Sequence, residues 1–178
     1  MANPLDEFIQ DHRLDRESGI SIVSEEDISQ LRSTGYSVED LLDHLNEHYQ
    51  SLLHGSRTEF NNHLKPNEEG RVFSTDSGAI ALLKAVISNE LPFPGLKYPY
   101  FIDGRNPLVV KIHGINDETI GEKGFVYVLN QRQGFTNDPT GSWQYIKRGE
   151  TPIAARIPVK RSDFAYPIID VTNSRIIQ

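Results

Sequence analysis

The sequence predicts an α+β fold, in which helices precede or interrupt a β core of mixed or antiparallel strands. Apolar residues recur at helical spacing up to about residue 50, and short extended runs bounded by glycine, asparagine and proline follow. The chain has 178 residues, of which 37% are hydrophobic, enough for one compact unit. We expect an N-terminal arm and helical cap over residues 1–50 and an α+β domain over residues 51–178.

The first part of the chain predicts an arm and two helices. Residues 1–23 lack a sustained period, so we expect an arm or short elements packed on the body. Ser24 precedes three acidic residues, which is typical of a helix start, and Gly35 ends that helix. Ser37 and Asp40 resemble a capping box that opens a second helix, to about residue 50. The apolar stripe of this second helix is Val38, Leu41, Leu42, Leu45 and Tyr49.

The rest of the chain predicts a buried helix among strands. The buried helix covers residues 77–88, is capped by Asp76 or Ser77, and ends before Pro92. We expect the strands that begin near residues 52, 108, 125, 143 and 152 to share one β core, on which this helix packs. The predicted strands are 52–54, 72–74, 108–112, 125–129, 143–146, 152–157 and 166–171.

The net charge of -7 argues against general binding of nucleic acid, because such binding depends on many contacts from Lys and Arg. Residues 1–70 carry 15 acidic and 5 basic side chains, and the remainder carries 10 acidic and 13 basic ones. The basic excess within residues 131–161 fits either a local anion-binding surface or ordinary solvated loops. Its members are Arg132, Lys147, Arg148, Arg156, Lys160 and Arg161.

Composition also narrows the cellular setting. The chain has no cysteine, which excludes disulfides and thiolate chemistry and fits a cytoplasmic protein. Its most apolar run, residues 78–87, is far shorter than the ~20 residues of a membrane-spanning helix. The polar, acidic first residues do not resemble a secretory signal. We therefore expect no membrane partner.

One motif matches a zinc site formally. His44 and His48 form an H-x-x-E-H pattern, which places two imidazoles one helical turn apart beside Glu47. Two such ligands and a carboxylate can hold zinc for hydrolysis. Both histidines flank an apolar stripe, and no third-ligand helix is evident, so a solvated helix edge explains the pattern better.

The more informative segment is His54-Gly55-Ser56. A histidine at the end of a short strand, followed by glycine, can offer one ligand a ring nitrogen together with an unobstructed backbone N–H and C=O. A structural turn is the alternative. The sequence has no glycine-rich dinucleotide fingerprint, no P-loop and no nucleophile elbow, which disfavours the enzyme classes that depend on them.

Three segments in order resemble the ADP-ribosyltransferase fold. They are His54-Gly55-Ser56, residues 72–76 (Val-Phe-Ser-Thr-Asp) and Gln144-Tyr145-Ile146. The resemblance is to the branch of the poly-ADP-ribose polymerases and RNA 2'-phosphotransferases, and to small bacterial and phage proteins with a His-Gly-Ser strand. The resemblance covers roughly residues 51–171, and it consists of the order of the predicted elements and of these short motifs.

The resemblance implies an NAD site. His54 would hydrogen-bond the 2'-hydroxyl of the nicotinamide ribose, the backbone of Gly55 would hold the carboxamide, and Ser56 would belong to the same cofactor-binding strand. Gln144 takes the place of the family's glutamate, which stabilises the positive charge that develops as nicotinamide leaves. Both His54 and Gln144 should therefore line one concave site.

Two departures from the family pattern bear on activity. Residues 77–87 contain no aromatic side chain to stack on nicotinamide, so the stack would come from Phe73, Tyr98 or Tyr100. The neutral Gln144 keeps a hydrogen bond but loses the charge, which implies weak transfer, another acceptor or binding alone. Glu150 on the following turn would be a substitute carboxylate or a solvated loop residue.

Three functions follow in order of preference. The first is an ADP-ribosyltransferase-like domain that binds NAD or a related nucleotide and passes ADP-ribose to a macromolecular acceptor or to water. The second is a noncatalytic nucleotide- or protein-binding module on the same fold. The third is a zinc hydrolase that uses His44 and His48.

Overall fold

A computed structural model shows a mixture of helices and mixed or antiparallel sheets, the α+β character that the sequence predicts. The four helices and the strands named below belong to the part of the chain that the structure describes. That part comprises residues 3–16, 19–87, 100–103, 108–112, 119–130, 132, 134–138, 144–173 and 175–177.

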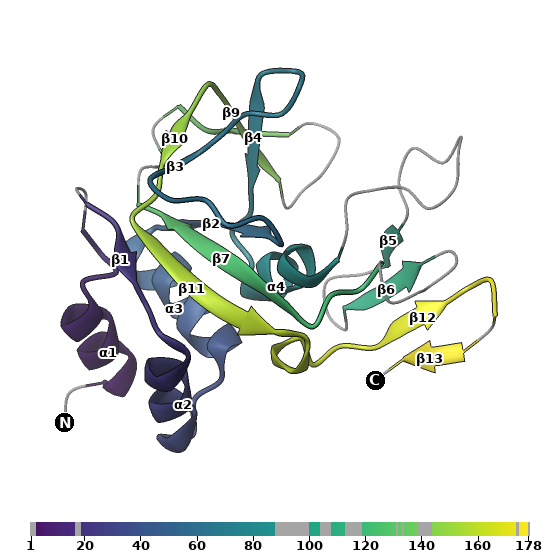
Figure 1. The fold of residues 1–178 in the computed structure, drawn as a ribbon, viewed down its shortest axis with the longest axis horizontal. Coiled ribbons are helices and arrows are strands. Elements are labelled where there is room, and N and C mark those ends of the chain that lie inside the picture. The colour runs from purple at the N-terminus through teal and green to yellow at the C-terminus, as the bar shows by residue number, and fades with distance from the viewer. Residues whose placement is uncertain are drawn as a thin grey trace.

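A four-stranded sheet forms the centre of the molecule (Figure 1). Its strand order is β1-β11-β7-β2, in which β1 pairs with β11 in parallel and the other pairs are antiparallel. Both faces of β7 are largely buried, as expected for a strand covered on both sides. The strands are β1 (Ser21–Ile22), β2 (Leu52–Ser56), β7 (Lys123–Leu129) and β11 (Ala155–Lys160).

Helix α4 (Gly78–Val86) packs unusually close to this sheet because two strand residues lack side chains. A methyl group added to Gly55 would lie 1.9 Å from the carbonyl oxygen of Ala81, and one added to Gly124 would lie 1.8 Å from that of Ala85. No side chain fits at such distances. Glycine at both positions is therefore a requirement of the helix–sheet contact.

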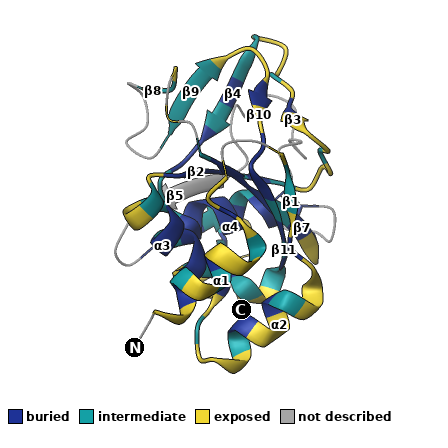
Figure 2. Ribbon diagram, turned by 90° about the vertical axis from the view of Figure 1, so that its left-hand side faces the viewer, coloured by how far each residue is buried: buried dark blue, intermediate teal, exposed yellow. Residues whose placement is uncertain are grey.

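The other three helices lie on the same side of the central sheet as α4, and of these α3 packs directly on α4 (Figure 2). Figure 2 shows them on one side of the buried central sheet, with the smaller sheets that hold β3, β4, β9 and β10 on the other. Ser37 makes the predicted capping box with Asp40, and Ser24, predicted as a helix start, makes a capping box with Asp27, so both predicted helix starts are confirmed. The helices are α1 (Pro4–His12), α2 (Glu25–Ser33) and α3 (Val38–Tyr49).

A second apolar cluster lies on the sheet face away from α4. It contains Leu52, Tyr127 and Leu129 from the central sheet and Val72 from β4. Above it stand a two-stranded sheet of order β10-β3 and a three-stranded sheet of order β4-β9-β8. Their strands are β3 (His63–Leu64), β4 (Arg71–Ser74), β8 (Thr136–Asn137), β9 (Tyr145–Arg148) and β10 (Thr151–Pro152).

The last sheet has the order β13-β12-β6-β5, with β12 and β6 parallel. A single 3-10 turn, η1 (Arg161–Asp163), joins β11 to this part of the chain. The strands are β5 (Tyr100–Asp103), β6 (Val109–Ile112), β12 (Ile168–Asp170) and β13 (Arg175–Ile177).

The expectation of one shared β core is only partly correct. The strands that begin near residues 52 and 125 share the central sheet with β11, and α4 packs on them as predicted. The strand near residue 108 belongs to another sheet, and the one near residue 143 to a third. The single strand predicted over residues 152–157 is divided in the structure between β10 and β11. Pro92 and Trp143 lie outside the described residues.

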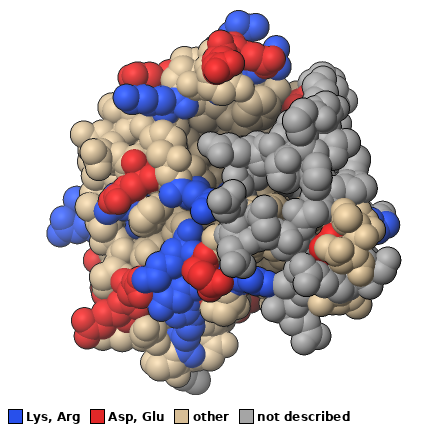
Figure 3. All heavy atoms as spheres, turned by 45° about the vertical axis from the view of Figure 1, so that its right-hand side comes forward, with Lys and Arg blue, Asp and Glu red and all other residues tan. Residues whose placement is uncertain are grey.

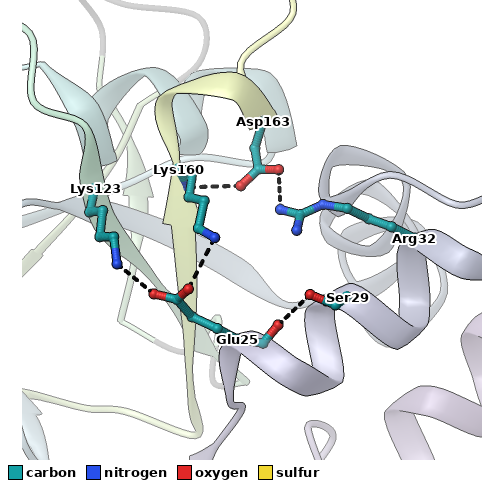
Figure 4. A network of polar contacts seen from close by, with 6 residues as sticks. All are labelled: Glu25, Ser29, Arg32, Lys123, Lys160 and Asp163. Carbon is teal, nitrogen blue, oxygen red and sulfur yellow. Dashed lines mark hydrogen bonds and ion pairs between the residues drawn. The ribbon is translucent and has the colours of Figure 1, made fainter.

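An ion-pair network attaches α2 to the end of the central sheet (Figure 4). Lys123 and Lys160 are directly opposite each other on β7 and β11, a placement that is unfavourable for like charges. Glu25 bridges them, with oxygen–nitrogen distances of 2.8 Å and 3.0 Å. Arg32 of α2 also pairs with Asp163 at 2.5 Å. The hydrogen bonds from the two lysines lower the pKa of Glu25 to about 2.

This network predicts an acid-sensitive contribution to stability. Because the pKa of Glu25 is lower in the folded chain, its contribution is complete above the ordinary carboxyl pKa and disappears as pH falls from about 4.5 to about 2. We expect Glu25→Gln to lower the urea midpoint at pH 7 slightly, since the charges are exposed. The difference should shrink at pH 3 and vanish near pH 2. Glu26→Gln, on the same helix turn, is the control, and an equal effect of both would contradict the assignment.

The close helix contact predicts that Gly124→Ala is strongly destabilising. The added methyl group meets the backbone of α4, which cannot rotate away, so the cost should exceed the usual overpacking range of about 1–3 kcal/mol. Urea unfolding measures it. Gly121→Ala is the matched control, because its methyl group meets the side chain of Arg57 instead. Equal midpoints for the two variants would show that α4 does not need glycine at position 124.

Candidate functional site

His54 lies where β2 and β4 separate. Its neighbour Gly55 faces α4, so alternation along β2 places the His54 side chain on the opposite face. The ring contacts Phe60 and Tyr127, with centroid distances of 6.3 Å and 6.2 Å. Ring atom Nδ1 donates a hydrogen bond of 2.6 Å to the backbone carbonyl of Phe73 on β4. The ring is thereby fixed between the two strands.

This hydrogen bond defines the chemistry of the His54 ring. A carbonyl oxygen only accepts, so the proton lies on Nδ1. Burial lowers the pKa of His54, which keeps the ring neutral at pH 7. Atom Nε2 therefore carries a lone pair, and the described part of the chain provides it with no hydrogen-bond partner. It can accept a hydrogen bond from a hydroxyl group.

Strands β2 and β4 pair at one point only. Leu53 and Thr75 exchange two backbone hydrogen bonds, of 2.9 Å and 2.8 Å. In a continued antiparallel ladder Gly55 would lie opposite Phe73 and bond to it. Instead the His54 ring donates a hydrogen bond to the carbonyl of Phe73. The regular pairing ends after a single residue pair.

The consequence is that β4 does not pair with the backbone of Gly55. The N–H and C=O groups of alternate residues point to the same edge of a strand. Those of Leu53 point toward β4, so those of Gly55 point toward β4 as well. Among the described residues neither group has a partner. Gly55 is buried, and a buried unpaired backbone group costs about 1–3 kcal/mol. A donor and an acceptor thus lie side by side, where a planar amide would satisfy both.

Gln144 lies across β4 from His54. It immediately precedes β9, where Tyr145 pairs with Ser74 of β4, and its carbonyl accepts a hydrogen bond of 2.8 Å from the backbone of Asp138. Strands β2 and β9 thus lie on the two sides of β4, which meets β2 at the Leu53–Thr75 pair. The described structure has no hydrogen bond between the side chains of His54 and Gln144. That they line one cleft stays a prediction.

The other predicted ligand residues are placed unevenly. The hydroxyl of Ser56 accepts the backbone N–H of Thr58, which stabilises the turn after β2. Phe73 is half-buried on β4, beside the site. Tyr98 lies outside the described residues, as does the side chain of Tyr100 on β5. The source of an aromatic stack is therefore open.

Sequence reasoning missed the aromatic support beneath His54. Tyr127 is opposite His54 on β7 and is fully buried. Its hydroxyl accepts the backbone N–H of Phe60 and donates to the carbonyl of Thr58, both at 2.8 Å. These bonds attach the segment after Ser56 to the sheet. The apolar β7 strand was visible in the sequence, but its register with β2 was not.

A second missed contact joins β9 to the start of α4. The hydroxyl of Tyr145 donates to Asp76 at 3.1 Å. Because Tyr145 is the neighbour of Gln144, this bond places a carboxylate at the same end of β9. The sequence offered Asp76 only as a helix cap or as part of a family-like motif.

Two cavities among the described residues lie away from His54. One lies between α2 and the ends of β7 and β11, and a broader one lies between those strand ends and β12. Neither is lined by His54, Gly55 or Gln144. The evidence for the site at β2 is therefore its unpaired backbone and the His54 ring.

The two helix histidines have a local explanation. Nε2 of His44 lies 2.7 Å from a carboxylate oxygen of Asp6, and the His44 and His48 rings are 4.2 Å apart. Tyr49 donates to the same carboxylate at 3.0 Å. Among the described residues no group of three or more side chains is arranged to hold a metal ion. The contacts attach α1 to α3.

At least three of the six residues in the predicted basic segment have described partners. Arg132 donates to the carbonyl of Gln50, Arg156 pairs with Glu59, and Lys160 pairs with Glu25. Figure 3 shows acidic side chains among the basic ones on the face that it draws. These pairings favour the ordinary-surface interpretation of the basic excess.

Comparison with protein-family models, with curated proteins and with solved structures finds no match. Helices in the described ranges are all too short or too polar to cross a lipid bilayer.

Proposed function

We propose that this chain is an ADP-ribosyltransferase-like domain that binds NAD at the edge of β2, between His54 and Gln144. The observation that carries the proposal is the buried N–H and C=O of Gly55, next to the His54 ring, for which the described residues provide no hydrogen-bond partner. The motif order noted in the sequence supports it independently.

The geometry suits a carboxamide. The amide nitrogen of nicotinamide would donate to the carbonyl of Gly55, and the amide oxygen would accept from its N–H. Nε2 of His54 would accept a hydrogen bond from a hydroxyl of the attached ribose. These three bonds satisfy the polar groups that the described chain leaves unpaired.

Gln144 determines how active such a site is. A glutamate there would stabilise the positive charge that develops on the ribose, whereas an amide contributes only a hydrogen bond. The same residue supports a second candidate, a noncatalytic module that binds the nucleotide without cleaving it. Both candidates share the binding site, and nicotinamide release separates them.

The carboxamide contact predicts selectivity for NAD over its deamidated analogue, nicotinic acid adenine dinucleotide. A carboxylate cannot donate to the carbonyl of Gly55 and is repelled by it. We expect binding at least tenfold weaker for the analogue by isothermal titration calorimetry. Equal affinities would exclude the Gly55 contact.

His54→Ala should weaken NAD binding. The loss of one hydrogen bond costs about 0.5–1.5 kcal/mol, or roughly 2–10-fold in dissociation constant. His63→Ala is the control, since His63 is exposed on β3. Thermal shift gives the first readout, because NAD at 100 times its dissociation constant stabilises by about 2.7 kcal/mol. If NAD does not stabilise the parent chain, the proposal fails.

Gln144→Glu should raise the rate of nicotinamide release. The new charge faces a ribose that becomes positive only as the glycosidic bond breaks, so the transition state gains more than the ground state. We expect the rate of single-turnover nicotinamide release at saturating NAD to rise at least tenfold. Gln30→Glu, exposed on α2, controls for added charge. An unchanged rate would mean that position 144 does not face the ribose.

A further inference from the structure

The hydrogen bond between Asp76 and Tyr145 places a carboxylate beside the position where the resemblance lacks one. Asp76 follows Thr75, the residue that joins β4 to β2. Tyr145 follows Gln144 and is opposite Ser74 on β4. The Asp76 carboxylate therefore lies near the C-terminal end of β4. Strand β4 separates β2, which contains His54, from β9, which Gln144 precedes.

The side chains of Ser77 and Asp43 bind backbone N–H groups at the start of α4. The hydroxyl of Ser77 caps the helix by accepting from the backbone of Ile80 at 3.4 Å. The N–H of Gly78 donates to Asp43 of α3 at 2.7 Å. Asp76 instead accepts from a tyrosine on another strand, which directs its carboxylate toward β9. Its burial is intermediate, so a ligand can approach it.

We propose that Asp76 replaces the missing glutamate and makes the domain an active NAD glycohydrolase, with Tyr145 as its positioning residue. The inference rests on the proposed function. The Asp76 carboxylate faces the nicotinamide ribose and stabilises the positive charge that develops on it, and Gln144 contributes a hydrogen bond to a ribose hydroxyl.

The reaction is a hydrolysis whose atoms balance with water alone. The bond between the ribose carbon C1' and the nicotinamide ring nitrogen breaks, and its electron pair stays on that nitrogen, so nicotinamide leaves as a neutral molecule. The oxygen of a water molecule bonds to C1', and the proton that it loses goes to solvent. Asp76 forms no bond to the substrate and acts through its charge.

The test measures NAD affinity and single-turnover nicotinamide release for the parent chain, Asp76→Asn and Asp76→Glu. We expect Asp76→Asn to slow release at least tenfold while the dissociation constant of NAD changes by less than threefold. Asp76→Glu keeps the charge and should retain at least a tenth of the parent rate. Glu150→Gln, which removes the exposed carboxylate on the turn after β9, should leave both quantities unchanged.

Two further variants separate a charge effect from a structural one. Tyr145→Phe removes the bond that positions Asp76 and should lower the release rate with little change in NAD affinity. Asp76→Asn combined with Gln144→Glu returns a carboxylate to the neighbouring position and should restore release. A structural role for Asp76 predicts no such restoration.

Several results would overturn the inference. One is a parent chain that binds NAD but releases no nicotinamide, which leaves the binding proposal intact. Another is an unchanged release rate in Asp76→Asn. If that variant does not fold, release from Asp76→Glu below a hundredth of the parent rate, with NAD still bound, decides against it. A parent chain that does not bind NAD removes the proposed function itself, and this inference with it.

Discussion

The proposed site depends on one interaction, the single backbone pair between Leu53 and Thr75. This pair holds β4 at the edge of the central sheet. The two strands separate after it, because the His54 ring is hydrogen-bonded to the carbonyl that Gly55 would otherwise bind. A longer ladder would satisfy Gly55 and leave nothing for a ligand. With no pairing at all, β4 and the Gln144 strand would not be held near β2.

The packing of α4 holds this arrangement in place from the other face. Gly55 and Gly124 allow the helix backbone to touch the sheet, so β2 cannot shift without displacing α4. The need for glycine at position 55 comes from this contact and not from the ligand. The same residue therefore has two roles in the proposed site: its missing side chain allows the close helix contact, and its backbone faces the proposed binding edge.

Local features of the fold were predictable and nonlocal ones were not. The capping boxes at Ser24 and Ser37 involve residues three apart, so the sequence shows them directly. The division of the strands among several sheets depends on pairings between distant segments, which periodicity does not report. For the site, the sequence singles out His54 and Gly55 as a strand-end pair, but both lie within β2 and Gly55 is buried. The bond from Tyr145 to Asp76 joins residues 69 positions apart and has no sequence signal.

The central claim is that the Gly55 backbone binds a carboxamide, and the Gly55 amide resonance tests it most directly. The measurement is a titration of the 15N-labelled chain with nicotinamide, followed by amide NMR, with nicotinic acid as the comparison. A new hydrogen bond at its N–H should shift the Gly55 amide proton downfield, with a much smaller response to nicotinic acid. A Gly55 resonance that stays unchanged while nicotinamide shifts residues elsewhere would contradict the account.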